Sequence, residues 1–298
     1  MGSNLKISIT KTLSLTIING QQLSTGKEFG LIALDGKTLY GKAWVPQDPL
    51  AMVCLIHGLG EHIDRYDHVA RHLNHSGIAL FGIDLRGHGH NEGKKGHARC
   101  QDLWDDIESL MKHARLLFLD VPLFLYGHSW GGNIVSNFVL RRNSSEIQGV
   151  ILSSPWLKLY FEPSSAEMTL AKLMSKVFPS FTRSNGLDAS YLSRDPAIGE
   201  AYQKDALVHT RISAGLFSEA TVNASYALQH ASSVTQPVLI FHGTDDQITS
   251  SKGSEEFAGA ASNSKLKLWP DMRHETHNEY GKEEVLDLVC QWLVQTAV

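Results

Sequence analysis

The chain has 298 residues, of which 42% are hydrophobic and 19% are charged, and its formal net charge is −4. This balance is ordinary for a globular protein of one or two domains. The charges are interspersed, so the sequence lacks the basic patch that nucleic-acid binding needs. Three cysteines, Cys54, Cys100 and Cys290, lie far apart, which predicts neither a disulfide framework nor a cysteine metal site.

The sequence also gives no sign of a membrane anchor. No segment approaches the ~20 consecutive apolar residues that a membrane-spanning helix requires. The first residues lack the uninterrupted apolar core of a signal peptide. Three matches to the glycosylation sequon, at Asn74, Asn143 and Asn223, are short enough to arise by chance. We therefore expect a cytoplasmic protein.

A segment that is hard to assign precedes the first clear strands. Residues 7–18 alternate in part like a strand, but residues 1–25 are equally compatible with a loosely held arm. Residues 29–45 have the pattern of a β-hairpin. Two apolar runs flank Asp35 and Gly36, a dipeptide that favours a tight hairpin turn.

Three continuous apolar runs follow, the pattern of parallel strands that are covered on both faces. These runs are residues 51–56, 78–83 and 121–125. A helical pattern follows each run, at 65–75, 103–117 and 133–140. We therefore predict an α/β fold with a mostly parallel sheet and helices on both faces. The loops 57–62, 84–89 and 127–131 each follow a strand, so we expect all three at the carboxyl edge of the sheet, where sites form.

The pattern changes at Pro155. Between 156 and 232 no parallel-strand pattern occurs, and helical patterns at 164–178 and 201–231 flank a polar, loop-like stretch. We predict that residues 156–232 form a helical cap inserted into a core of residues 1–155 and 233–298. The first cap helix carries an apolar stripe with helical spacing, formed by Leu170, Leu173, Met174, Val177 and Phe178. The stripe either packs on the core or faces substrate or lipid.

The candidate nucleophile is Ser129. Residues 127–131 match the pattern G-x-S-x-G between a strand and a helix, the context in which a serine stands at the apex of a tight turn. The glycines are needed because side chains there would collide with the strand and the helix. The helix after Ser129 directs N–H groups and the positive end of its dipole toward the serine oxygen. A serine hydroxyl is a weak nucleophile, so it requires a base and a group that orients the base.

Two later loops supply those groups in the chain order Ser, Asp, His that this context favours. The strand pattern resumes at 238–241 and 266–269, and a helical pattern at 284–293 ends the chain. The first of these strands leads to Asp245 and Asp246, and the second leads to His274 and His277. We favour Asp246, because the residues before it would form the turn from which it emerges, with Asp245 as the alternative. We favour His274 over His277 because it is nearer the strand end.

A tetrahedral intermediate needs two backbone N–H donors. We predict that these belong to Trp130, the residue after the nucleophile, and to Leu59, in the loop after the strand at 51–56. His57 is predicted to bond loop backbone rather than substrate, and the polar residues of 84–89 to build their loop. The sequence contains no H-E-x-x-H, P-loop or G-x-G-x-x-G pattern, so we predict no metal, cofactor or nucleotide.

Five ordered motifs resemble the monoacylglycerol lipase and lysophospholipase branch of the α/β-hydrolases. They are HGLGEH from His57, DLRGHG from Asp84, GHSWGG from Gly127, GTDD from Gly243 and HETHNE from His274. The likeness extends over about residues 28–295, and the stretch 191–196 shares it. It implies an α/β-hydrolase fold with a cap. The roles that it implies are nucleophile for Ser129, orienting carboxylate for Asp246, base for His274, and oxyanion donors for Leu59 and Trp130.

The resemblance also implies the reaction. Its members hydrolyse carboxylic esters that carry one acyl chain, through an acyl-enzyme and without a cofactor. The expected partner is therefore a small acyl ester. The cap of the family forms an apolar tunnel and often touches membranes, so peripheral membrane contact through the cap is a further expectation; the oligomeric state stays open. The candidate substrate-binding residues are Trp130, Trp156, Leu170, Leu173 and Met174.

Two departures from the family pattern and two competing functions accompany this prediction. Trp130 stands where the family usually has methionine, and its bulk could shorten the acyl pocket; Asn91 stands where serine is frequent. The competing functions are a non-lipid carboxylesterase or proline-iminopeptidase-like peptidase, and a non-catalytic ligand-binding protein. An anionic cap pocket would favour the peptidase. The acids to examine for it are Glu162, Glu167 and Glu219.

Overall fold

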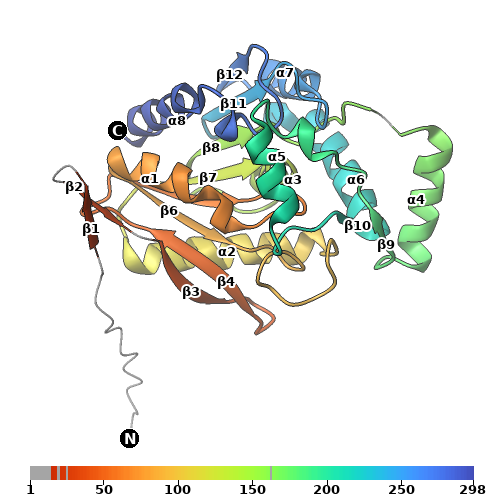
Figure 1. Cartoon of the computed structure of the whole chain (residues 1–298), viewed down its shortest axis with the longest axis horizontal. Coiled ribbons are helices and arrows are strands. Elements are labelled where there is room, and N and C mark those ends of the chain that lie inside the picture. The colour runs from red at the N-terminus through yellow and green to blue at the C-terminus, as the bar shows by residue number, and fades with distance from the viewer. Residues whose placement is uncertain (1–14, 19–20, 25, 162) are drawn as a thin grey trace, which may run out of the picture.

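The computed structural model describes residues 15–18, 21–24, 26–161 and 163–298. An eight-stranded sheet forms its centre, in the order β12-β11-β8-β7-β5-β6-β4-β3 (Figure 1). Its strands are β3 (Lys27–Ile32), β4 (Thr38–Trp44), β5 (Ala51–Ile56), β6 (Ile78–Ile83), β7 (Leu123–His128), β8 (Ile147–Ser153), β11 (Val238–Gly243) and β12 (Ser264–Trp269). In this sheet β6, β5, β7, β8, β11 and β12 are parallel to one another. Strand β4 is antiparallel to both of its neighbours, β6 and β3. The mostly parallel α/β sheet that we predicted is therefore confirmed.

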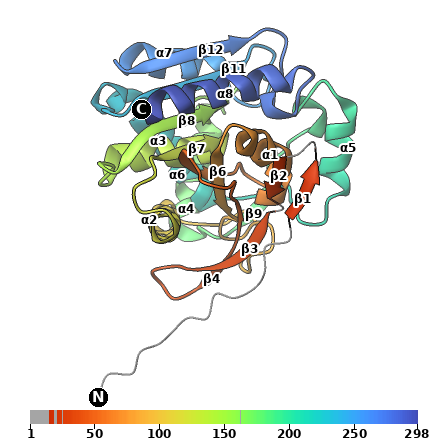
Figure 2. The ribbon, with the colours of Figure 1, turned by 90° about the vertical axis from the view of Figure 1, so that its left-hand side faces the viewer.

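Helices cover both faces of this sheet. The core helices are α1 (Asp67–His75), α2 (Cys100–Leu117), α3 (Trp130–Arg141), α7 (Ser251–Ala260) and α8 (Lys282–Ala297), with 3-10 turns η1 (Ile63–Tyr66) and η4 (Thr276–Asn278). Figure 2 shows the strands between α2 and α3 on one side and α1 on the other. Strand β5 is wholly buried, and its alternate residues enter two separate cores, Met52 and Cys54 on one face and Val53 and Leu55 on the other. Burial on both faces explains why this strand is a continuous apolar run.

The predicted hairpin at 29–45 is confirmed as β3 and β4. The register pairs Ile32 with Thr38 across the turn that holds Asp35 and Gly36. Gly36 has φ 83°, a backbone conformation that residues with a side chain adopt only under strain. Asp35 is also used beyond the turn, because its carboxylate pairs with Arg86 in the 84–89 loop. The hairpin therefore supports one of the loops at the carboxyl edge of the sheet.

The segment between β8 and β11 is mainly helical, as expected. It contains α4 (Ser165–Val177), β9 (Thr182–Ser184), η2 (Ala189–Tyr191), α5 (Pro196–Lys204), β10 (Arg211–Ser213), α6 (Ala214–His230) and η3 (Ala231–Ser233). Helix α4 packs on α6, which packs in turn on α3 and α7 (Figure 1). The helical pattern at 201–231 does not form one continuous helix. Asp195 caps α5, Ser213 caps α6, and an extended stretch between them includes β10, which pairs with β9.

The structure describes only part of the N-terminal segment. Residues 7–14 lie outside the described part of the chain, whereas β1 (Leu15–Ile18) and β2 (Gln21–Ser24) form a separate antiparallel pair beside α1. Among the described residues, no helix has the length and apolar character to cross a membrane.

Candidate active site

Ser129 stands at the sharp turn between β7 and α3, with φ 53° and ψ −117°. A non-glycine residue in such a region costs about 1–3 kcal/mol, so the surrounding contacts must impose it. The Ser129 N–H donates to the carbonyl of Ser153 on the neighbouring strand, at 2.9 Å. The carbonyl of Ser129 accepts from the N–H of Trp156, also at 2.9 Å. The nucleophile turn is therefore tied to the end of β8 on one side and to the segment after it on the other.

The glycines of the turn are required by close packing. A side chain on Gly127 would overlap the backbone of Gly131, and one on Gly131 would overlap the carbonyl of Ile56 at the end of β5. Both clashes involve backbone atoms, which cannot rotate away. This is the collision that the sequence pattern predicted, so the G-x-S-x-G glycines are explained by strand and helix packing.

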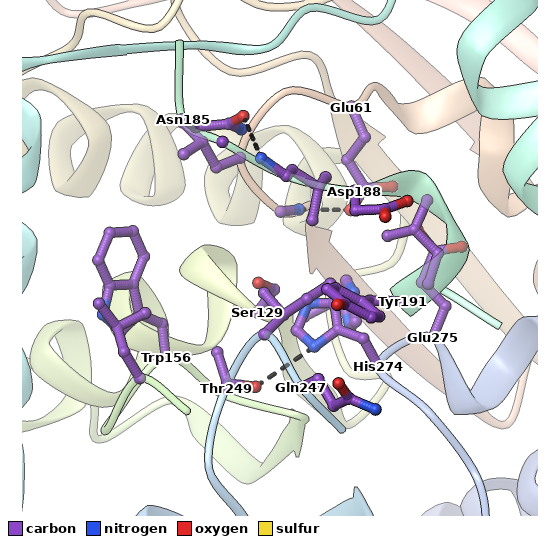
Figure 3. Close-up of a pocket in the computed structure, with 18 of the residues that line it drawn as sticks. Glu61, Ser129, Trp156, Asn185, Asp188, Tyr191, Gln247, Thr249, His274 and Glu275 are labelled. Carbon is purple, nitrogen blue, oxygen red and sulfur yellow. Dashed lines mark hydrogen bonds between the residues drawn. The ribbon is translucent and has the colours of Figure 1, made fainter. Parts of the chain in front are cut away.

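The carboxylate of Asp246 is the hub of the hydrogen bonds beside this turn. Its Oδ2 accepts from Nδ1 of His274 at 2.7 Å, from Nε2 of His242 at 2.9 Å and from the hydroxyl of Thr249 at 2.9 Å. Its Oδ1 accepts from the backbone N–H groups of Ile248 and Thr249, at 2.8 and 3.0 Å. With Nδ1 committed to Asp246, the Nε2 atom of His274 is free to face Ser129 in the same cavity (Figure 3).

Electrostatics keep Asp246 ionised and make His274 more basic. Burial alone would raise the pKa of Asp246, but the charge of His274 and the bonds from His242 and His274 hold it below its usual range. Burial would lower the pKa of His274, yet the Asp246 carboxylate and its hydrogen bond raise it above 6.5. A buried, oriented imidazole with a raised pKa is a stronger base than a free one.

The alternatives that the sequence left open lie elsewhere. Asp245 is exposed and lies 3.7 Å from Arg273. His277 is buried against Tyr66 and His128 rather than beside Asp246, and burial lowers its pKa to about 3. The structure therefore brings together Ser129, Asp246 and His274. It places Asp245 and His277 outside this group.

The loop after β5 is arranged around the turn. The N–H of Gly58 is occupied, because it donates to the carboxylate of Glu61 at 2.6 Å. Leu59, the next residue, lines the cavity that contains Ser129, and Trp130 begins α3, where helix N–H groups have no partner within the helix. His57 bonds only backbone, through the carbonyl of Gly58 and the N–H of Leu85, which confirms its predicted structural part.

Comparisons with known proteins identify the family of the chain. Residues 47–281 match the family described as serine aminopeptidase, S33. A monoacylglycerol lipase of Mycolicibacterium smegmatis is 32% identical over 91% of this chain and 98% of its own length. The crystal structure of Paleococcus ferrophilus monoacylglycerol lipase has a TM-score of 0.80 and 32% identity, covering 87% of this chain and 99% of that one. The chain belongs to this family of α/β-hydrolases.

A third relative has a different organisation. An uncharacterized abhydrolase domain-containing protein of Dictyostelium discoideum is 34% identical over 90% of this chain, but the chain spans 29% of that protein's length. The shared part is therefore the hydrolase region. The predicted α/β-hydrolase fold and the predicted family are both confirmed by these matches.

In this hydrolase a cavity of about 280 Å³ opens on Ser129 and His274. Its lining changes character from one side to the other. In Figure 3 the carboxylates of Glu61, Asp188 and Glu275 lie on one side of Ser129, and the indole of Trp156 lies on the other. The further apolar lining residues are Leu59, Leu159, Phe161, Leu187, Leu192, Phe217 and Ile248. Leu187, Leu192 and Ile248 pack with Tyr202, whose ring lies beside Arg65, so apolar side chains also occur near the carboxylates. The serine thus lies between a polar end, which carries the carboxylates, and an apolar end at Trp156 and Phe217.

The predicted substrate-binding residues divide into two groups. Trp156 lines the cavity, as expected. Leu170, Leu173 and Met174 lie on α4, outside the cavity wall, and the first two are exposed. The structure contradicts their placement in the pocket because α4 meets α6 through the face that carries Met168, which leaves the predicted stripe outward.

The structure also contradicts the predicted role of the Trp130 side chain in the wall of the acyl pocket. Its indole is fully buried and lies 5.4 Å from the ring of His88, measured between centroids. As the first residue of α3, Trp130 directs its side chain into the core beside the 84–89 loop. Trp130 is not among the residues that line the cavity at Ser129, so its bulk does not shorten the acyl pocket.

Three polar residues of the site were missed by sequence reasoning. His242 and Thr249 bond Asp246, and Asn133 donates to the carbonyls of Trp156 and Ala220, each at 2.9 Å. His242 had a detectable signal, because it is the polar end of an otherwise apolar strand. Thr249 also lies close to its partner, three residues after Asp246, so its contact was within reach of a local pattern. The partners of Asn133 are distant in sequence, so no local pattern identifies it.

Proposed function

We propose that the chain is a serine hydrolase that cleaves carboxylic esters of single acyl chains, monoacylglycerols or similar lipids, through an acyl-enzyme intermediate. The observation that carries the proposal is the shared cavity of Ser129 and His274, with His274 bonded to buried Asp246 at 2.7 Å. The relatives named monoacylglycerol lipase support the substrate class.

The geometry supports a two-step mechanism. His274 takes the proton of the Ser129 hydroxyl as the oxygen attacks the ester carbonyl, while Asp246 holds the imidazolium. The backbone N–H groups of Leu59 and Trp130 stabilise the oxyanion that forms. Collapse of this intermediate breaks the ester bond, and His274 returns the proton to the departing alcohol. Water, activated by His274 in the same way, then releases the fatty acid from Ser129.

The two ends of the cavity fit the two parts of such a substrate. Arg65 donates to Glu61 and, through both of its terminal nitrogens, to Glu275, each at 2.7 Å. This buried cluster engages every carboxylate oxygen of Glu61 and Glu275. The polar end therefore offers a polyol alcohol Asp188 and the hydroxyl-bearing side chains of Tyr191 and Tyr202, which line the cavity. The apolar end at Trp156 and Phe217 suits the acyl chain.

We further propose that residues 156–232 act as a cap and that the enzyme works in the cytoplasm at membrane surfaces. Helix α4 exposes the apolar side chains of Leu170, Leu173, Val177 and Phe178. Such a group of exposed apolar residues is typical of a surface that meets another apolar phase. All three cysteines are buried free thiols, which is usual in a reducing compartment.

A peptidase activity is the second candidate, because the family description names an aminopeptidase. That activity would need a free acid near the site for the substrate amine. Glu167 instead caps α4 through Ser164, and Glu219 accepts the N–H of Cys100 at 2.7 Å. Glu162 lies outside the described residues. Of the three acids at the cavity, Glu61 and Glu275 already share Arg65, and Asp188 accepts the N–H of Ser190 as the cap of η2, so we rank the esterase first.

A labelling experiment tests the proposal. A fluorophosphonate probe should label the wild-type protein, and Ser129→Ala should abolish both labelling and the hydrolysis of p-nitrophenyl esters. Aminoacyl p-nitroanilides in the same assay measure the peptidase alternative. Turnover of anilides without esters would establish the peptidase instead. Folded wild-type protein that is neither labelled nor active would support a non-catalytic ligand-binding protein.

A further inference from the structure

A second cavity adjoins the catalytic one at its apolar end. This second cavity has a volume of about 400 Å³ and is lined by the 156–159 segment, by Met168 of α4 and by Thr221, Ala224, Ser225 and Leu228 of α6. Two side chains, Trp156 and Leu159, line both cavities. They therefore form the wall between the space at Ser129 and the space beneath α4.

Trp156 is held in this wall by the nucleophile turn itself. Its N–H donates to the carbonyl of Ser129 at 2.9 Å, and its carbonyl accepts from the side chain of Asn133 at 2.9 Å. Its ring lies 6.1 Å from that of Phe217, measured between centroids, and only 7% of the residue is exposed. With its backbone fixed at both ends and its ring packed, the indole cannot move aside cheaply.

The position of the wall decides which chains meet it. The alcohol and the first part of the acyl chain share the cavity of about 280 Å³ that contains Ser129. A long chain extends further from the ester carbonyl than a short one, so it is the long chain that reaches Trp156 and Leu159. The second cavity, of about 400 Å³, lies beyond these two side chains.

We propose that Trp156 closes the acyl end of the catalytic cavity and is the residue that restricts this enzyme to short and medium acyl chains. The inference rests on the proposed esterase function and names its substrate class more closely. Leu159 completes the wall, and the second cavity is the space that a longer chain would enter if the indole were absent.

The test is a chain-length series of p-nitrophenyl esters with four, eight, twelve and sixteen acyl carbons, measured as kcat/KM. Wild-type protein should prefer eight carbons over sixteen. Trp156→Ala should raise the ratio of the sixteen-carbon to the eight-carbon value about tenfold, because further methylenes then become buried. Trp156→Phe removes part of the indole and should raise the ratio less. If thermal melting shows that Trp156→Ala is unfolded, the ratio measured for Trp156→Phe tests the inference instead.

A filling substitution provides the matched control. Met168→Trp places bulk in the second cavity, at a residue that lines it and not the first. In wild-type background it should leave the ratio unchanged. In the Trp156→Ala background it should return the ratio toward the wild-type value, because the newly opened space is filled again.

The outcomes are distinguishable. An unchanged ratio in folded Trp156→Ala and Trp156→Phe, with hydrolysis of short esters intact, overturns the inference and leaves the esterase function standing. A wild-type preference for sixteen carbons that Met168→Trp abolishes also overturns it, since the chain would then already use the second cavity. Wild-type protein that hydrolyses no ester overturns the proposed function, and the inference with it.

Discussion

The carboxyl edge of the sheet and helix α4 are built in opposite ways. At the edge, Asp246 accepts five hydrogen bonds, Ser129 is fixed through both its N–H and its carbonyl, and all three candidate catalytic residues are at least nine-tenths buried. On α4, Leu170 and Leu173 are more than half exposed, and the helix rests on the rest of the protein mainly through α6.

The difference fits the tasks that we propose for the two regions. A nucleophile, a base and an orienting carboxylate work only within tenths of an ångström, so their supports have to be buried and redundant. A surface that meets lipid or admits an acyl chain needs apolar character but no fixed partner. Substitutions at the edge should therefore cost orders of magnitude in rate, and those on α4 should change only how substrate is reached.

Two histidines three residues apart give the sharpest test of the edge. His274→Ala should lower kcat about 10⁵-fold, because removal of the base disables the whole catalytic unit. His277→Ala, which removes an equally buried imidazole from the same loop, should cost far less. The measurement is ester turnover in folded variants. A larger loss for His277→Ala than for His274→Ala would refute the geometry that we assign to the edge.

The neighbouring aspartates offer a second matched pair. Asp246→Asn should lower kcat about 10⁴-fold, since an amide can donate to His274 and stabilise the wrong tautomer. Asp245→Asn changes an exposed carboxylate near Arg273 and should leave the rate near that of wild type. Steady-state kinetics on one short ester suffice. Equal losses in the two variants would mean that orientation of the base does not depend on Asp246.

The pH profile sharpens the picture of the hub. His274 must be neutral to act as a base, and its pKa is raised above 6.5, so kcat/KM should fall on the acid side with a midpoint above 6.5. His242→Leu removes one donor from the Oδ2 atom of Asp246. More of the carboxylate charge then faces His274, so the acid limb should move to higher pH.

The same variant should lower kcat about tenfold, the scale typical of groups that orient a reacting residue. His242→Gln keeps an amide donor and should recover part of both effects. If His242 has a purely structural role, both variants should have a lower melting temperature, and the midpoint of the pH profile should not change.

The edge was largely predictable from the sequence because its constraints are local. Gly127 and Gly131 are required by backbone packing, and the apolar runs before each loop fix which loops share an edge. Ser129 follows directly on β7, and Asp246 and His274 lie in the loops after β11 and β12, so strand order was enough to bring them together. The choice of Asp246 over Asp245 depended on the expected turn, and the choice of His274 over His277 depended on its shorter distance from the strand end; the sequence indicates both.

The segment between β8 and β11 was less predictable because helical periodicity does not say which face is buried. The stripe at Leu170 and Leu173 has the spacing of a packed face, yet it points outward. Trp130 shows the same limit within the site, since its position after Ser129 fixes its backbone but not the direction of its indole. Such directions are decided by tertiary neighbours that lie far away in the sequence.

The smallest expected effect concerns the exposed face of α4. Leu173→Glu places a charge where 58% of the leucine is exposed, so folding and the hydrolysis of a soluble short ester should be unaffected. Hydrolysis of monoacylglycerol in lipid vesicles should fall several-fold, because a charged side chain opposes the burial of this face in the headgroup region. Leu116→Glu, at an 86% exposed leucine on α2, is the control and should alter neither rate. Equal vesicle activity in both variants would mean that α4 is not the surface that meets lipid, and that its apolar stripe has another partner.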